Sequence, residues 1–170
     1  MPRRATVLRV FVASPSDVRE ERKALESIVA EVNQLQGTSS GIRLELIRWE
    51  THVRPGFGND AQAVINAQIS DNYDIFVGIM WTHFGTPTER AGSGTEEEFN
   101  QAFERFQRNR DTVSLLIYFK DAPIKPSSID ADQLAAVKRF QKRIQELDGF
   151  YGNGIKLSPK QSRNREVVEL

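Results

Sequence analysis

Runs of apolar residues predict the strands of a buried sheet. Residues 75–81 (IFVGIMW) and 113–119 (VSLLIYF) are almost continuously apolar, which is the pattern of strands covered on both faces in a parallel sheet. Residues 7–13 (VLRVFVA) are rich in β-branched residues and predict a further strand. Residues 42–49 (IRLELIRW) alternate apolar and polar positions, which predicts a more exposed strand near the sheet edge. We expect the strand at residues 75–81 to be central.

Between these strands the apolar residues recur every three or four positions, which predicts helices with one core-facing side. Helices are expected between the first two strands, at residues 60–69, from residue 95 onwards, and over residues 134–147 with Gly149 as the cap. The polar composition of residues 51–59 indicates a loop, which would act as a lid. The core-facing positions are Val18, Leu25, Ile28, Val32 and Leu35 in the first helix, Phe99, Ala102, Phe103 and Phe106 in the third, and Leu134, Val137, Phe140, Ile144 and Leu147 in the last.

The first helix carries a start signal directly after the first strand. Ser14 suits the N-cap, and Pro15 suits the first helical position, where its missing N–H has no cost. Asp17 would then place its carboxylate at the positive end of the helix. The sequence therefore predicts a helix that begins at Ser14.

The alternation of strands and helices predicts an α/β fold. It indicates an open parallel sheet with right-handed crossovers and helices on both faces. We expect the flavodoxin-like strand order 2-1-3-4, with a fifth strand if residues 155–157 supply one. Residues 1–150 are expected to form this single domain, and residues 151–170 a C-terminal extension or linker.

Composition narrows the possible partners. The 23 basic and 23 acidic side chains cancel, so the chain has no overall field for nucleic acid or an anionic membrane, and neither partner is expected. The absence of cysteine is typical of a reducing compartment, and a cytoplasmic protein without a membrane span is expected. The only two histidines, His52 and His83, lack the neighbouring ligands of a metal site, so no metal is expected.

The candidate site lies where the strands end. Ligands bind at the carboxyl ends of parallel strands, near the point where the strand order reverses, which here is between the first and third strands. The loops at residues 14–17 and 81–98 would line that crevice. Nucleotide-binding motifs of the P-loop and G-x-G-x-x-G types are absent, as is G-x-S-x-G. The expected substrate-binding residues are Ser14, Ser16, Asp17, Trp49, Trp81, Phe84, Ser93 and Thr95.

Each of these residues also has a structural interpretation. Trp81, Phe84 and Trp49 could stack a planar base, or they could pack in the core. Ser14 and Ser16 could donate to a phosphate, although capping alone would explain Ser14. Both alternatives stay open at the level of the sequence.

Three consecutive glutamates begin the third helix. At about 100° per residue, Glu97 lies opposite the core-facing side, whereas Glu96 and Glu98 lie on its flanks. One interpretation is that a flanking carboxylate is catalytic. The other is that Ser93-x-x-Glu96 and Thr95-x-x-Glu98 are overlapping capping boxes that only stabilise the helix start.

Two segments resemble a known family. Residues 10–22 (VFVASPSDVREER) and 92–102 (GSGTEEEFNQA) resemble the TIR-like domains at the N-termini of bacterial defence proteins and of NACHT-type signalling ATPases, over roughly residues 8–119. Residues 94–102 are also similar to the glutamate-bearing helix start of nucleoside 2-deoxyribosyltransferases and enzymatic TIR domains. Both relatives cleave N-glycosidic bonds, and the resemblance implies Glu98 as the catalytic residue.

The resemblance implies one function and leaves two alternatives. An NAD-cleaving effector in antiviral defence or signalling would use NAD as its substrate, need no cofactor, and become active by self-association into an oligomer or filament. A fused or separate sensor or ATPase domain would be its partner. The Trp-Cys pair that is common before the glutamate of TIR domains is missing here. A non-catalytic interaction module and a nucleoside deoxyribosyltransferase-like enzyme therefore stay open as alternatives.

Overall fold

The computed structural model describes residues 5–35, 37, 40–47, 72–147 and 156–157, and these residues form a five-stranded parallel sheet. Its order is β2-β1-β3-β4-β5, which confirms the expected order 2-1-3-4 and adds a fifth strand beside β4. The strands are β1 (Thr6–Ala13), β2 (Ile42–Ile47), β3 (Ile75–Met80), β4 (Ser114–Lys120) and β5 (Lys156–Leu157). The predicted lid, the helix at residues 60–69, Trp49, Gly149 and most of the C-terminal extension lie outside the described residues.

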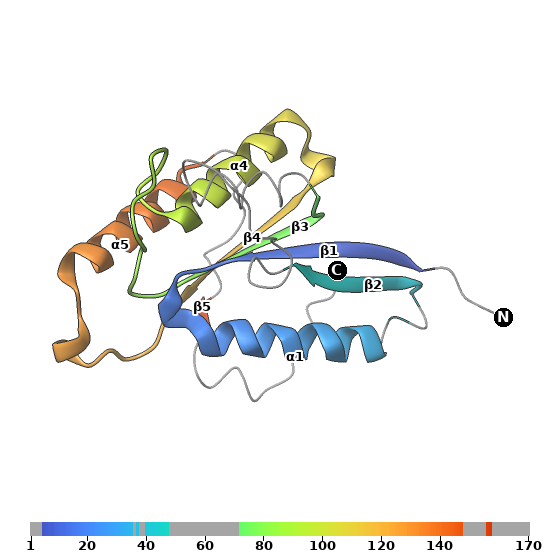
Figure 1. Cartoon of the computed structure of the whole chain (residues 1–170), viewed down its shortest axis with the longest axis horizontal. Coiled ribbons are helices and arrows are strands. Elements are labelled where there is room, and N and C mark those ends of the chain that lie inside the picture. The colour runs from blue at the N-terminus through green and yellow to red at the C-terminus, as the bar shows by residue number, and fades with distance from the viewer. Residues whose placement is uncertain (1–4, 36, 38–39, 48–71, 148–155, 158–170) are drawn as a thin grey trace, which may run out of the picture.

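Helices cover both faces of the sheet, as expected. In Figure 1, α1 (Arg19–Leu35) lies below the sheet, and α4 (Gly94–Arg108) and α5 (Ala131–Gln145) lie above it. Three short 3-10 helices, η1 (Ser16–Val18), η2 (Arg110–Thr112) and η3 (Pro126–Ser128), lie in the connections.

The alternation of side chains along the central strands produces two apolar cores. Phe76 and Met80 of β3 point to the α4 and α5 face, where they join Phe99 and Phe140. Val77 and Ile79 of the same strand, together with Val10 and Val18, form the core beneath α1. Strand β3 is buried along almost its whole length, which confirms that it is central.

The first helix is rotated relative to the predicted stripe. Ile28 and Leu35 are 52% and 69% exposed rather than buried, and Val29 is the buried residue of α1. The side-chain amide of Asn33 explains this rotation, because it accepts from the backbone N–H of Leu44 (2.7 Å) and donates to the Leu44 carbonyl (2.8 Å). This contact turns the Asn33 and Val29 side of the helix towards β2, so the predicted core role of Ile28 and Leu35 is wrong.

Strand β4 is less buried than its apolar sequence predicts. Leu116 is 41% exposed on the α1 face of the sheet, whereas Phe119 on the opposite face is buried against α5. Helix α1 packs mainly against β2, and Glu21 near its start reaches Lys120 at the end of β4. Leu116 in the middle of β4 stays exposed, so the prediction that β4 is covered on both faces is wrong at this residue.

Tyr118 provides a pH-dependent test of this core. Burial raises the pKa of the Tyr118 hydroxyl above its ordinary value of 10.0, because the charged form is poorly solvated there. The folded state keeps the Tyr118 proton up to a higher pH than the unfolded state does. The free energy of unfolding is therefore unaffected below the unfolded pKa and falls as the pH rises through the folded pKa. The maximum slope for one proton is about 1.4 kcal/mol per pH unit.

We expect Tyr118→Phe to abolish this part of the alkaline destabilisation. Urea unfolding of wild type and Tyr118→Phe at about pH 9 and about pH 11 gives the free energy of unfolding that each protein loses between the two pH values. We expect this loss to be larger in wild type. Equal losses of free energy in the two proteins would contradict the expectation.

Candidate functional site

The loops that follow β1 and β3 meet at the carboxyl edge of the sheet. The Oδ2 atom of Asp17 accepts from the backbone N–H of Thr82 (2.9 Å), the Thr82 hydroxyl (3.0 Å) and the backbone N–H of His83 (2.9 Å). Three hydrogen bonds to one carboxylate oxygen fix the loop after β3 to the start of the first helix. The two loops predicted to line the site are therefore in contact at the strand-order reversal between β1 and β3.

The first helix begins later than predicted. Pro15 precedes η1 in an extended conformation and makes no side-chain cap, and α1 starts at Arg19. The Ser14 hydroxyl accepts from Nε of Arg22 (2.9 Å), and the same guanidinium donates to the Ser14 carbonyl (3.0 Å). The prediction of Ser14 as the N-cap is wrong, because Pro15 holds the N-cap position and Arg22, eight residues further on, donates to the polar atoms of Ser14. Ser16 is exposed.

Helix α4 starts with a cap formed by Ser93. The Ser93 hydroxyl accepts from the backbone N–H of Glu96 (3.1 Å), and the Glu96 carboxylate accepts from the backbone N–H of Gly92 (2.7 Å). This arrangement confirms the predicted Ser93–Glu96 pair, with Gly92 in place of the cap residue as the second donor. Thr95 lies within the helix, so the predicted Thr95–Glu98 capping box is wrong. Ser93 is completely buried and serves the helix rather than an open surface.

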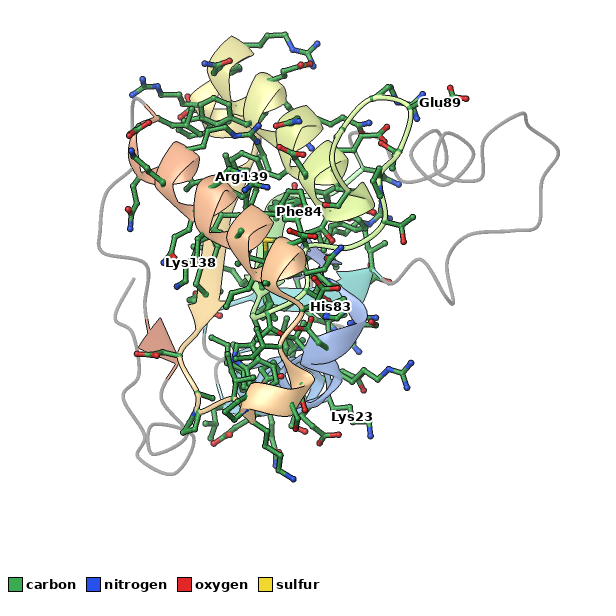
Figure 2. The ribbon with its side chains drawn as sticks, turned by 90° about the vertical axis from the view of Figure 1, so that its left-hand side faces the viewer. Lys23, His83, Phe84, Glu89, Lys138 and Arg139 are labelled. Atoms are coloured by element: carbon green, nitrogen blue, oxygen red, sulfur yellow. The ribbon has the colours of Figure 1, made fainter. Side chains whose placement is uncertain are left out.

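Glu96 and Glu97 each form an ion pair with an arginine. Oε1 of Glu96 lies 2.7 Å from a guanidinium nitrogen of Arg143 on α5. Glu97 is buried and pairs with Arg90 from the loop after β3. Figure 2 shows this loop curving past the start of α4, with Glu89 at its outer end. The loop therefore covers Glu97, which the sequence placed opposite the core-facing side of the helix, and its burial there was not predicted.

Glu98 is half-buried on the other flank of the helix. It lies about 200° around the axis from Glu96. Because Glu96 turns towards α5, Glu98 lies on the flank away from α5, which is the β1 side of the sheet. The fold therefore brings Glu98 to the side of α4 on which the strand order reverses.

The two predicted aromatic residues of the loop differ in their surroundings. Phe84 is buried, and its ring lies 5.6 Å from that of Phe140. Its backbone N–H and that of Gly85 donate to Oε1 of Gln133, at 2.8 and 3.0 Å. Phe84 is a core residue, which corrects its assignment as a base-stacking residue.

Trp81 remains partly exposed at the end of β3. The Nζ atom of Lys120 lies 4.0 Å from the centre of its ring and 2.6 Å from Oε1 of Glu21. Sequence reasoning missed Lys120 and Glu21, and it also missed Gln133. The spacing of Glu21 four residues after Asp17 is a local signal that could have found one of them. Lys120 and Gln133 reach the site only through the tertiary fold.

The described ranges also bear on two other types of site. They contain no group of three or more His, Asp or Glu side chains placed to hold a metal ion. Within the same ranges, every helix is too short or too polar to cross a bilayer.

The burial of Glu97 leads to a stability prediction. Glu97→Gln keeps the shape of the side chain but removes the charge that pairs with Arg90, and a hydrogen bond to a charged group contributes about 1.5–3 kcal/mol. The Arg90 side chain is 46% exposed, so its charge stays solvated and the loss should not exceed that range. Urea unfolding measures this loss of stability in Glu97→Gln. Glu89→Gln on the exposed end of the same loop is the matched control, and equal stability of the two variants would contradict the structural role of Glu97.

Comparison with known proteins identifies a family. A search of curated proteins finds no match to the chain. The family model described as a domain of unknown function (DUF4062) matches residues 9–163, a range that begins in β1 and ends beyond β5. The chain therefore belongs to the DUF4062 family.

Proposed function

We propose that this domain is a TIR-like effector that cleaves the bond between nicotinamide and ribose in NAD or a closely related nucleotide. Glu98 is the reacting carboxylate. The observation that carries the proposal is the position of Glu98 on the flank of α4 nearest the strand-order reversal, opposite the flank on which Glu96 contacts α5. The resemblance of residues 94–102 to enzymes that cleave N-glycosidic bonds supports the same residue.

One carboxylate suffices for this chemistry. As the bond to nicotinamide breaks, positive charge develops on the ribose, and the bonding electrons neutralise the pyridinium nitrogen of the leaving group. Nicotinamide departs as a neutral molecule and needs no proton, so a general acid is not required. Glu98 stabilises the cationic sugar or bonds to its C1 atom, and water then completes the hydrolysis.

The proposal includes activation by self-association in bacterial defence or signalling. The test is to incubate the full chain with NAD over a range of protein concentrations, to follow free nicotinamide by chromatography, and to measure particle mass by light scattering. Activity that appears together with the assembled species supports the proposal. A strictly monomeric protein with full activity would contradict activation by assembly.

The same assay separates the alternatives. A non-catalytic interaction module is favoured by the exposed apolar side chains of Ile28 and Leu35 on α1, and it predicts no nicotinamide release in any assembled state. A deoxyribosyltransferase-like enzyme predicts exchange of the base of free deoxynucleosides without release of nicotinamide from NAD.

A further inference from the structure

The connection between β4 and α5 (residues 121–130, DAPIKPSSID) is exposed along almost its whole length. Ala122 and Ile124 are half-buried, and its other residues are exposed. Because the connection follows β4, it lies at the carboxyl edge of the sheet, and in Figure 1 it forms the bend that leads from β4 into α5. It contains two prolines three residues apart, Pro123 and Pro126. They belong to neither apolar core, and the proposed cleavage does not use them.

The backbone of this connection turns with a period of three residues. Lys125 has φ −66° and ψ 129°, which is the polyproline II conformation, and Pro126 after it disfavours the helical alternative. The ring of Pro123 fixes its own φ at about −65°, which also suits polyproline II. Polyproline II has three residues per turn, and so has the 3-10 helix η3 that begins at Pro126. Residues three positions apart therefore lie on the same side of the connection.

Three apolar residues with this spacing are exposed together, namely Pro123, Pro126 and Ile129, and we refer to them as the proline ridge. The backbone N–H of Ile129 donates to the Pro126 carbonyl (3.3 Å), which holds these two residues one turn apart. Ile129 is 40% exposed and is among the large apolar side chains that the described part of the chain leaves in solvent. The connection thus buries part of Ile124 and presents the ridge to solvent.

The charge of the connection decides which kind of partner fits the ridge. Its single base, Lys125, lies between Asp121 and Asp130, so two acids outweigh one base. Nucleic acid and anionic membranes are held by clusters of basic side chains, and this segment offers none. A protein groove lined by aromatic rings matches the ridge in shape, because such grooves receive prolines at this spacing. Lys125 is exposed beside the ridge, where a carboxylate at the rim of the groove would complement its charge.

We propose that the proline ridge docks into the aromatic-lined groove of a partner protein that recognises polyproline II segments. Pro123 and Pro126 fill the groove, Ile129 extends the apolar contact, and Lys125 pairs with an acidic residue at the rim. The segment is ordered before the partner arrives, because the backbone N–H of Ser128 donates to the Lys125 carbonyl (2.9 Å) and the prolines restrict the chain, so little entropy is lost on docking. This surface does not depend on the cleavage of NAD.

A titration followed by NMR tests the docking without any enzymatic assay. The nitrogen-15-labelled full chain is titrated in turn with an SH3, a WW and an EVH1 domain, which all have grooves of this kind. We expect at least one of these domains to shift the amide resonances of Ile124, Lys125 and Ser127 saturably. Pro123→Ala and Pro126→Ala are each expected to weaken that binding by on the order of 10-fold, because each removes one of the two prolines that fill the groove.

Matched controls separate the ridge from other exposed residues. Pro87 is exposed in the loop after β3 and has no proline three residues before or after it, so Pro87→Ala should bind like wild type. Lys125→Glu reverses the charge beside the ridge and should weaken binding, whereas Lys138→Glu, at an exposed position on α5, should not. All four sites are exposed or lie outside the cores, and thermal unfolding checks that each variant is folded.

The outcomes decide between the partner and other occupants of the ridge. An absence of shifts at residues 121–130 with all of these domains would overturn the proposal, as would equal affinity of wild type and both ridge alanine variants. Shifts at residues 121–130 that grow with the concentration of the chain alone, and that Pro123→Ala removes, would mean that the ridge joins copies of this chain, and the partner assignment would fail. If an alanine variant does not fold, the comparison of Lys125→Glu with Lys138→Glu decides.

Discussion

Glu98→Gln is expected to lower the rate of nicotinamide release from NAD by on the order of 10²-fold or more. Glutamine preserves the shape of the side chain and removes the charge, so it cannot stabilise the cationic sugar or bond to C1. Glu98 follows the first turn of α4, where the cap formed by Ser93 and Glu96 already satisfies the helix start. The substitution should therefore leave the fold intact. The measurement is nicotinamide release by assembled protein at saturating NAD.

Two controls make this result specific to Glu98. Glu104→Gln changes an exposed glutamate on the same helix and should leave the rate unchanged. Thermal unfolding of each variant separates a lost reaction from a lost fold. If Glu98→Gln cleaves as fast as wild type while folded Glu96→Gln or Glu97→Gln is inactive, Glu98 is not the reacting residue.

Phe140→Ala is expected to reduce the free energy of unfolding by about 3–5 kcal/mol, the usual cost of removing a large buried aromatic side chain. Phe140 is 4% exposed, and its ring centre lies 5.3 Å from that of Phe99, 5.6 Å from that of Phe84 and 6.4 Å from that of Phe119. These partners belong to α4, the loop after β3, and β4. No single neighbour can fill the space that the ring leaves.

Urea unfolding with comparison of midpoints and slopes measures this loss. Phe140→Leu keeps much of the apolar volume and should lose less than Phe140→Ala. Because Phe99 follows Glu98 directly and packs on Phe140, the folded leucine variant should also release nicotinamide more slowly. A loss below about 1 kcal/mol for Phe140→Ala would show that the core relaxes around the missing ring.

The sequence by itself determined the order and type of the elements in the described part of the chain. Periods of two and of three to four residues distinguish strands from helices locally, and a strand–helix alternation has few compact arrangements. The central position of β3 followed from its continuous apolar run, and the apolar side of α4 followed from the helical spacing of Phe99, Ala102 and Phe103.

Polar contacts between distant segments were decided only by the tertiary structure. Local rules assigned Ser14 and Asp17 to the start of a helix. In the structure, Arg22 donates a hydrogen bond to Ser14, and the loop after β3 donates hydrogen bonds to Asp17. Asn33 likewise sets the rotation of α1 through the edge of β2. A donor or acceptor binds whichever partner the fold brings within reach, and sequence spacing does not contain that information.

The three glutamates separate what the sequence determines from what only the tertiary structure decides. Helical geometry correctly placed Glu96 and Glu98 on opposite flanks of α4, because that relation depends only on the turn per residue. It did not predict the burial of Glu97, because periodicity describes one helix and its core, whereas this burial depends on a loop that returns over the far side with Arg90. Lys120 and Gln133 reach the candidate site only when parallel strands and their following helices converge at one edge of the sheet.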